Sequence, residues 1–541
     1  HKRSTLILSS HQENLAVFTR PSDSAQLLKD HSPVREDSEL DQLPKPTPNL
    51  EPPFIGIRRD FLNRFPQYGS DIRDGVNPQA VATILYLTLA VLAPTIGFGG
   101  VLGEATGQSM GVIETIAGTS MSGVLYGLFS AQPVQIIGVQ GPVIAYILAL
   151  YQLAKVTNLP FLPLYACTGL WTSAFLACFA ISSASNIVQH LTRWTDEIFS
   201  VLVSFIFLSQ AIGDVSKTFT VAGPANTALL TLVTSSLTFG TAMVLKTLNT
   251  TRYFTKSIRK NLSNFAPAIG GFVGAIAARA ARTNWQIVLP ALSLPSQLVT
   301  SSGRPWIVSG LTQANVWLMA LPAGMAAAIL LYLDQNITAR LVNHPRYKQV
   351  KGKRTSVLDG MHLDLLVLSV VTAISSLFGL PWMCGAPTRS AAHVRALAIV
   401  DEKGETQGTV ENRVTGTTVH ALVGLCAVAA LPRQLIAQVP KPVLSGIFLN
   451  LGFTSLNGAE LWDRIRCLFK DKVVEPFNKA GRREMNRYTF AQLSSLFAMM
   501  AATQSKFGVV SPLLIALLPV VRWGLIKARV VSKDSVDVMD S

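Results

Sequence analysis

The segment PWMCGAPTRSAAHVRAL (residues 381–397) places Arg389, His393 and Arg395 directly behind a Gly-Ala-Pro-Thr break. The run before these charges, from Leu365 to Thr388, contains no charged side chain. About 20 apolar residues suffice to cross a bilayer as one helix. A break followed by charges therefore indicates a chain that enters the apolar layer as a broken helix, which is tolerated where it lines a cavity or is buried in protein.

The composition indicates a membrane protein. Of the 541 residues, 49% are hydrophobic and only 14% are charged, and the mean hydropathy is +0.37. A soluble domain carries about 25% charged residues. Apolar runs of spanning length recur, for example AVATILYLTLAVLAPTIGFGG (residues 80–100). We therefore predict an all-α polytopic membrane protein and exclude a soluble globular one.

The apolar runs divide into two sets of seven, which gives fourteen predicted transmembrane segments. They lie near residues 78–97, 111–131, 142–154, 161–184, 196–213, 226–246 and 265–281, and then near 313–333, 362–380, 389–400, 411–431, 441–455, 490–505 and 509–526.

The third span of each half is short and follows a Gly/Pro interruption. The two sequences are GVQGPVIAYILALY (138–151) and GAPTRSAAHVRALAIV (385–400). Matching broken segments in two halves of a membrane chain are typical of inverted-repeat transporters and mark their binding site. We therefore predict a 7+7 inverted repeat with short half-helices in spans 3 and 10.

A half-helix that begins in mid-membrane offers N–H groups and a positive dipole end, which together favour an anion. In the first half we expect Gly141 to cap the helix and Pro142 to take its first position, where the missing N–H costs nothing. In the second half we expect Thr388 to cap, with Arg389 in the first turn.

Arg389 is unfavourable where it stands unless something offsets its charge. A cation opposes the dipole at a helix N-terminus, and a charge at bilayer depth costs about 3 kcal/mol or more. An oxyanion held by two helix N-termini and the planar guanidinium would offset that cost. The alternative is that Arg389 reaches an interface or pairs structurally with an acid.

Asp334 closes an apolar run in AAAILLYLDQNITARLV (residues 326–342). Thr338 lies four residues on, hence on the same helical face. A carboxylate and a hydroxyl together suit sodium or a proton relay, so these residues are candidates for a coupling-ion site. The alternative is an interfacial carboxylate at a helix end.

Other ionisable residues in apolar surroundings have simpler interpretations. His393 and His420 are expected to be hydrogen-bonded core histidines. Glu104 is as well explained by a structural role as by gating.

The sequence contains no GxxxxGK[ST] and no HExxH motif, and its five cysteines lack metal-ligand spacing. We therefore expect no cofactor, no enzymatic activity and no metal apart from a possible sodium ion at Asp334.

The net charge of +15 is concentrated in short loops between apolar runs, which is a topology signal and not a nucleic-acid signal. The positive-inside rule places these loops and both termini in the cytoplasm, which requires an even number of spans. We expect residues 1–57 to form a disordered cytoplasmic N-terminal tail, 58–527 the membrane domain, and 528–541 a cytoplasmic C-terminal tail.

Taken together, these segments resemble the anion-exchanger and bicarbonate-transporter family of solute carriers, to which the borate transporters are related. The resemblance runs from about Arg58 to Lys527. Seven motifs carry it: FGGVLGEATGQSMGV (98–112), LFSAQPVQIIGVQGPV (128–143), TRWTDEIFSVLVSFIF (192–207), YLDQNITARLV (332–342), HLDLLVL (362–368), GLPWMCGAPTRSAAHVRAL (379–397) and PKPVLSGIFLNLGFTSLNG (440–458).

The resemblance implies a core domain of spans 1–4 and 8–11 (about 75–190 and 313–404) and a gate domain of spans 5–7 and 12–14 (about 191–290 and 411–527). It also implies a homodimer and elevator-like alternating access. The anion is expected between the starts of spans 3 and 10, and Asp334 falls on the acid of span 8. The matching substrate-binding positions are Gln140, Gly141, Pro142, Val143, Thr388, Arg389 and Ser390.

Two departures from the family pattern concern coupling. Electroneutral exchangers combine an arginine at the Arg389 position with Glu in span 8, whereas sodium-coupled members carry Asp there and an aliphatic residue in place of the arginine. This chain combines Arg389 with Asp334, and it has Pro387 where a hydroxyl residue is usual, which weakens the case for sodium.

The function expected from these observations is secondary transport of bicarbonate or a similar small inorganic anion, coupled to sodium or to counter-anion exchange. Borate transport is the first alternative, because borate transporters share the span 8 Asp but lack the arginine. An anion-binding membrane anchor or sensor without transport is the alternative of another class. The expected partners are membrane lipid, the anion and a second copy of the chain, and the expected location is the plasma membrane.

Overall fold

The computed structural model describes residues 52–540 except 191–192, 221–223, 256–257, 260–261, 264, 293, 296, 353–358, 401–405, 458, 469–480 and 505–510. Most of the predicted N-terminal tail (1–57) therefore lies outside the described residues. A helix, α3 (Ile55–Arg64), already begins inside that range, and α4 (Tyr68–Arg73) follows it.

A helix stands at each of the fourteen predicted positions. In chain order they are α5 (Pro78–Ala105), α6 (Val112–Phe129), α7 (Gly141–Val156), α8 (Phe161–Ile181), α9 (Arg193–Thr220), α10 (Ala225–Thr247), α12 (Ala266–Trp285), α13 (Ala314–Val342), α14 (Met361–Leu377), α15 (Pro387–Leu397), α16 (Val414–Val428), α18 (Lys441–Asn457), α20 (Arg482–Gln504) and α21 (Ser511–Lys527). The helical membrane fold is thus confirmed.

Length and apolarity alone identify fewer spans than fourteen. Six of the described helices pass that test, or seven if the bent pair α16 and α17 (Ala430–Ala437) is counted as one. The count of fourteen stays a prediction, because the other described helices at predicted positions do not pass; α7, α14 and α15, for example, have only 16, 17 and 11 residues.

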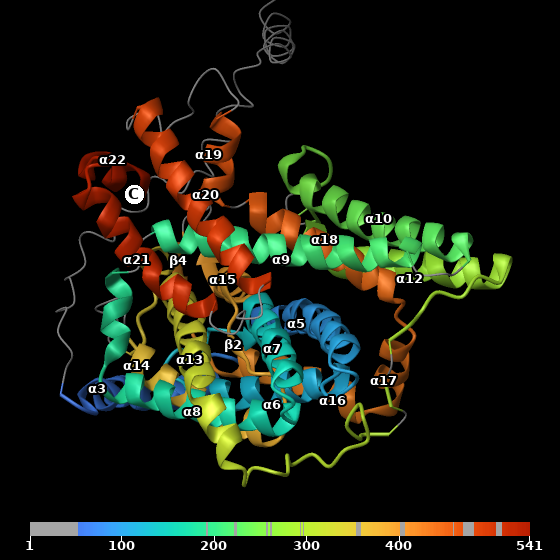
Figure 1. Cartoon of the computed structure of the whole chain (residues 1–541), viewed down its shortest axis with the longest axis horizontal. Coiled ribbons are helices and arrows are strands. Elements are labelled where there is room, and N and C mark those ends of the chain that lie inside the picture. The colour runs from blue at the N-terminus through green and yellow to red at the C-terminus, as the bar shows by residue number, and fades with distance from the viewer. Residues whose placement is uncertain are drawn as a thin grey trace, which may run out of the picture.

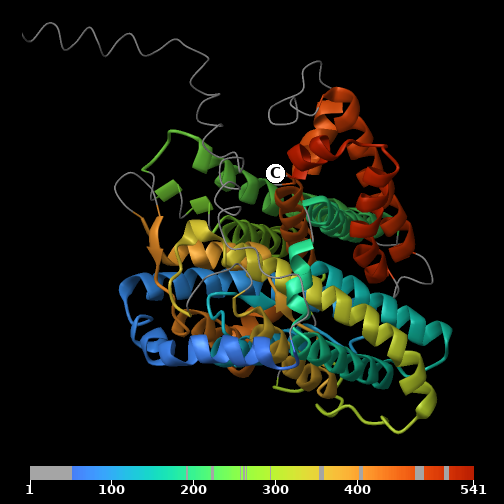
Figure 2. The ribbon, with the colours of Figure 1, turned by 90° about the vertical axis from the view of Figure 1, so that its left-hand side faces the viewer.

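The helices form two groups (Figures 1 and 2). In the first, α13 and α14 pack on α8, and α16 packs on α5 and α6. In the second, α18 packs on α9 and on α10, and α10 packs on α12. The first group contains the helices at predicted spans 1–4 and 8–11. Because span 11 is α16, this group runs beyond residue 404, where the predicted core range ended. The second contains the predicted gate spans, with α20 and α21 against α9.

Two short strands join the broken segments inside the first group. Strand β1 (Ile137–Gly138) pairs antiparallel with β2 (Cys384–Gly385), with Ile137 opposite Gly385. Each strand leads into a half-helix, α7 or α15, within three residues. Strand pairing satisfies backbone groups that a broken helix would otherwise leave unbonded in an apolar layer.

Two details of the predicted span 10 were wrong. The segment was expected to run from 389 to 400, but α15 ends at Leu397, and β3 (Ala398–Val400) then pairs with β4 (Thr406–Thr409). The cap was expected at Thr388, but Ala386 is the N-cap and Thr388 lies inside the first turn. Pro387 explains the shift, because a proline is well placed in the first turn of a helix.

The remaining elements are short helices at the ends of the bundle. They are η2 (Phe65–Gln67), η3 (Ala184–His190), η4 (Leu248–Thr250), η5 (Pro345–Tyr347), α19 (Glu460–Leu468) and α22 (Lys533–Asp540). The last of these lies in the predicted C-terminal tail.

Candidate functional site

The two half-helices begin on either side of the β1–β2 pair. The N-cap of α7 is Gln140, so Gly141 is its first residue and Pro142 its second, one position later than expected. The N-cap of α15 is Ala386, whose N–H donates to the carbonyl of Ile136 at 2.9 Å. The pairing therefore holds both helix N-termini close to one short ladder.

Arg389 crosses from α15 to the strand that precedes α7. It is 8% exposed, and its Nη2 donates to the carbonyl oxygen of Val139 at 2.6 Å. Its Nη1 is buried and has no hydrogen-bond partner in the described part of the chain. A Cβ added to Gly138 would lie 3.0 Å from this Nη1, so the glycine makes room for the guanidinium.

The residues on either side of Arg389, Thr388 and Ser390, differ in burial and in hydrogen bonding. The Ser390 hydroxyl accepts from the N–H of Ile136 at 2.9 Å and can donate to its carbonyl at 3.0 Å. These bonds fix the strand. Thr388 is exposed and makes no hydrogen bond to the ladder in the described part of the chain. Of the three predicted residues on α15, the structure thus brings Arg389 and Ser390 to the break.

The predicted residues at the start of α7 line the other side. Gln140 is half-buried, and Gly141, Pro142 and Val143 are buried. A Cβ added to Gly141 would lie 2.9 Å from the ring of Phe207 on α9. The first turn of α7 is therefore in close contact with the second helix group.

Asp334 is 3% exposed in α13, and its Oδ2 accepts a hydrogen bond from the thiol of Cys384 on β2 at 3.4 Å. The Thr338 hydroxyl donates to the backbone carbonyl of Asp334 at 2.7 Å, so its proton is not directed at the carboxylate. In the described part of the chain no ion pair joins Asp334 to Arg389.

Sequence reasoning missed the residues that hold β2 in place. Gln335 accepts from the N–H of Gly385 at 2.9 Å and donates to the hydroxyl of Tyr126 at 2.9 Å. The Tyr126 hydroxyl donates in turn to Gln135 at 2.9 Å. The only sequence signal was the polar run Asp334-Gln335-Asn336 inside an apolar helix.

The histidines are hydrogen-bonded core residues, as expected. The ring of His393 lies 2.6 Å from both the Val134 carbonyl and the Thr415 hydroxyl. The ring of His420 lies 2.9 Å from the carbonyl of Ile137. Both rings therefore support the segment that leads into β1.

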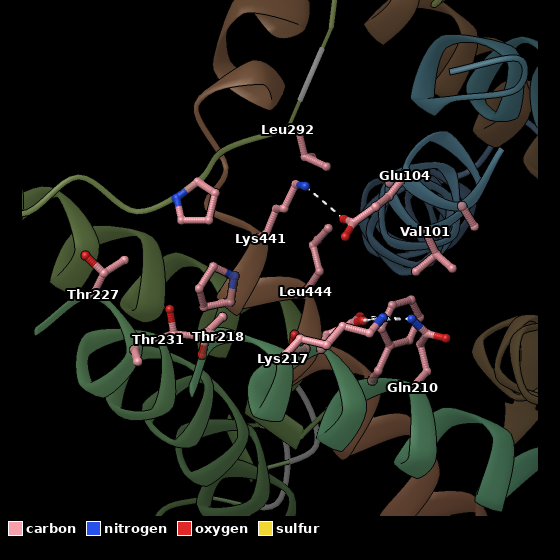
Figure 3. A pocket seen from close by; sticks show the side chains of 18 of the residues that line it. Val101, Glu104, Gln210, Lys217, Thr218, Thr227, Thr231, Leu292, Lys441 and Leu444 are labelled. Atoms are coloured by element: carbon pink, nitrogen blue, oxygen red, sulfur yellow. Dashed lines mark hydrogen bonds and ion pairs between the residues drawn. The ribbon is translucent and has the colours of Figure 1, made fainter. Parts of the chain in front are cut away.

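A cavity of about 590 Å³ lies between the two helix groups (Figure 3). Its walls come from α5 and α7 on one side and from α9, α10 and α18 on the other. The lining is largely apolar, with the charged side chains of Glu104, Asp214, Lys217 and Lys441. A cavity of this size is typical of small-molecule sites.

The cavity ends at aromatic rings. Phe448 lines it, and the rings of Phe98 and Phe207 lie 5.1 Å and 6.1 Å from that of Phe448. Because Phe207 also packs on Gly141, these three rings stand between the cavity and the start of α7.

The charges at the cavity are paired with each other. Lys441 at the start of α18 lies 2.8 Å from Glu104 near the end of α5, and this pair connects the two helix groups (Figure 3). Lys217 lies 3.5 Å from Asp214, which also accepts from Gln210. The ion pair gives Glu104 a structural contact.

The chain matches the family model described as "HCO3- transporter integral membrane domain" over residues 52–223 and 219–541. It is 32% identical over 499 residues to the Band 3 anion transport protein of Rattus norvegicus, and 31% identical over 501 residues to that of Homo sapiens. It is 30% identical over 515 residues to the Anion exchange protein 3 of Rattus norvegicus.

Each of these alignments covers 86% of this chain, but only 52%, 54% and 41% of the respective relatives. The chain thus spans about half the length of the curated relatives it matches. These names describe transport and exchange proteins, which agrees with the expectation that the chain is not an enzyme.

Two solved structures have the same fold at low sequence identity. One is the transmembrane domain of a cyanobacterium bicarbonate transporter, BicA, with a TM-score of 0.54 and 14% identity, covering 82% of this chain and 98% of that one. The other is murine Slc26a9 in the inward-facing state, with a TM-score of 0.57 and 12% identity, covering 91% and 74%. The likeness supports a helical transporter fold. Given the family match along nearly its whole length, this chain is an integral membrane protein that belongs to the HCO3- transporter integral membrane domain family.

Proposed function

We propose that the chain is a secondary transporter of bicarbonate or a similar small inorganic anion, and that Arg389 binds the anion. The observation that carries this proposal is the Nη1 of Arg389, which is buried and has no partner in the described residues. A buried charged donor left unbonded is costly, and an oxyanion would both bond it and neutralise it.

The surroundings of Arg389 suit an oxyanion. The N-terminal turns of α7 and α15 meet at the β1–β2 pair, and their dipoles favour negative charge there. The Ser390 hydroxyl is committed to the backbone of Ile136, and Thr388 is exposed. We therefore assign direct binding to Arg389 and to the backbone around Gln140 and Val143, with Ser390 as a positioning residue.

Alternating access would move the first helix group past the second. The anion site belongs to the first group, whereas the cavity lies at the boundary between the groups. The rings of Phe98, Phe207 and Phe448 separate the cavity from the start of α7. A displacement that shifts α7 and Phe98 relative to α9 and α18 would open this separation.

Asp334 is the candidate for coupling. Its buried carboxylate accepts a hydrogen bond from the thiol of Cys384, which is a weak donor. Such a group requires a cation or a proton for charge balance. We propose that sodium or a proton binds Asp334, with the Thr338 hydroxyl oxygen available as a further ligand.

The test is flux into vesicles that contain the purified full chain. Bicarbonate, chloride, sulfate and borate are compared, each with and without sodium. Flux of bicarbonate that disappears in Arg389→Ala, and persists in Arg395→Ala on the exposed side of the same helix, is the expected result. Flux of borate alone would favour borate transport, and anion-dependent thermal stabilisation without flux would favour a sensor.

Sodium dependence tests Asp334 separately. If the wild type transports equally with and without sodium, and Asp334→Asn behaves in the same way at every pH, Asp334 is not a coupling site. The homodimer, the plasma-membrane location and the cytoplasmic position of both termini stay predictions.

A further inference from the structure

The helix that precedes the first span, α3, has its apolar side outward and its polar side toward the protein. The outward residues Phe54, Phe61, Leu62 and Phe65 are between 48% and 61% exposed. They recur at spacings of three and four with Arg58 among them, so they share one face. A helix exposed to water has the opposite arrangement.

The inward face of α3 is formed by Gly56, Asp60 and Arg64, which follow one another at spacings of four and are all buried. Asp60 accepts hydrogen bonds from the N–H groups of His362 and Leu363 at 2.9 and 3.1 Å, in the first turn of α14. The carboxylate therefore caps α14, which belongs to the first helix group.

Arg64 connects α3 to two further segments. It forms a two-bond pair with Asp71 at 2.7 and 2.9 Å and an ion pair with Glu411 at 2.9 Å. Glu411 lies just before α16. Since the polar side of α3 is bonded in this way, its orientation is fixed, and the phenylalanines cannot turn inward.

α3 lies at the end of the bundle from which the first predicted span starts. The N–H of Phe54 donates to the carbonyl of Ile181 at the end of α8, and α3 packs against α14. Only η2, α4 and a short turn separate α3 from α5, the first predicted span. The expected topology puts this end of the bundle in the cytoplasm.

The charge of Arg58 indicates what kind of molecule covers the apolar face of α3. It is exposed in the middle of the apolar face, four residues after Phe54 and three before Phe61. A second copy docked here by two-fold symmetry would bring two Arg58 side chains together. Acyl chains with an anionic headgroup instead match both the apolar and the cationic part of the face.

We propose that α3 lies in the plane of the cytoplasmic leaflet and binds anionic phospholipid, with Arg58 at the headgroup and Phe54, Phe61 and Phe65 among the upper acyl chains. Because Asp60 and Arg64 bond α3 to α14 and to the segment before α16, lipid bound to α3 stabilises the first helix group. This proposal does not depend on which anion is transported, or on whether any is.

The test uses the full chain in phosphatidylcholine nanodiscs with a rising fraction of phosphatidylserine, and it measures the melting temperature. We expect the melting temperature to rise with that fraction. Arg58→Gln should shift the midpoint of the rise about fivefold upward, as one arginine near an anionic surface contributes that factor to binding. Arg58→Lys, which keeps the charge, should restore the midpoint.

The matched control is Arg483→Gln, since Arg483 is an exposed arginine in the first turn of α20. Its midpoint should stay within about twofold of the wild type. A melting temperature indifferent to phosphatidylserine, or equal shifts for Arg58→Gln and Arg483→Gln, would overturn the proposal. So would a rise with protein concentration in neutral lipid, which would indicate a second copy on this face.

Discussion

Two buried arginines of this protein, Arg64 and Arg389, are equally hidden but differently bonded. Arg64 is 3% exposed, and Asp71 and Glu411 occupy all of its guanidinium nitrogens. Arg389 is 8% exposed and has a single carbonyl partner, with Nη1 unbonded in the described residues. The fully paired arginine connects segments, whereas the incompletely paired one keeps a donor nitrogen that the proposed anion would bond. Pairing, and not burial, is therefore what distinguishes the structural Arg64 from the proposed anion-binding Arg389.

The largest effect is expected from Arg64→Met. The change removes the ion-pair partner of Glu411 and one of the three cations beside Asp71. Breaking a buried ion pair in this way costs about 3–5 kcal/mol. We expect a loss of folded protein, seen as a strong fall in melting temperature or in the yield of monodisperse chain. A variant as stable as the wild type would show that Lys351 and Arg413 suffice to neutralise Asp71.

Arg389→Ala should give the reverse pattern. Anion flux should fall by at least about a hundredfold, as expected when a charge-assisted contact of about 3 kcal/mol is lost. The melting temperature without anion should stay the same or rise, because an unpaired buried charge is removed. A fall in stability comparable to that of Arg64→Met would assign Arg389 to structure.

The stability of the protein should depend on pH through Asp60, the buried acid that bonds α3 to α14. Burial raises its pKa to about 7, aided by nearby Asp364 and opposed by the N–H groups of Leu363 and Gly360. The folded state therefore binds a proton that the unfolded state, with a carboxyl pKa near 3.9, has released. Stability should fall as the pH rises from about 4 to about 7 and level off above that value, by up to about 4 kcal/mol.

The measurement is the melting temperature from pH 5 to pH 8. Asp60→Asn should flatten the slope in this range, since an amide oxygen still accepts from the α14 N–H groups but does not ionise. An unchanged slope in Asp60→Asn would mean that another group titrates.

The smallest effect is expected from Gly138→Ala. The new Cβ would lie 3.0 Å from Nη1 of Arg389, so the guanidinium must move by a few tenths of an ångström. We expect a few-fold loss of flux, about 1 kcal/mol, with unchanged stability. The matched control is Gly408→Ala, where an added Cβ meets nothing within 4 Å. Equal flux in both variants would show that the position of Arg389 is not critical.

Much of this arrangement could be predicted from local sequence. The broken segments at Gly138 and Gly385 indicated half-helices, because glycine and proline break helices locally and are easily seen inside an apolar run. Arg389 could be proposed as a site residue because a charge is costly at bilayer depth, and its role stays a prediction. Thr388 was misassigned as the cap, since Pro387 one residue earlier starts the helix.

Other features depend on contacts between distant segments. Nothing near Cys384 indicates that its thiol bonds Asp334, fifty residues earlier. The partners of Arg64 lie 7 and 347 residues away, and the aromatic rings that close the cavity come from α5, α9 and α18. The outward apolar face of α3 became clear only once Asp60 and Arg64 were seen to be bonded inward.

The sequence by itself thus determined a helical membrane protein with two interrupted spans, because hydropathy, glycine and proline act over a few neighbouring residues. Only the tertiary structure decided which buried charges are satisfied. That outcome depends on how segments far apart in the sequence meet in space. Two carboxylates bond the guanidinium of Arg64, whereas a single carbonyl bonds that of Arg389.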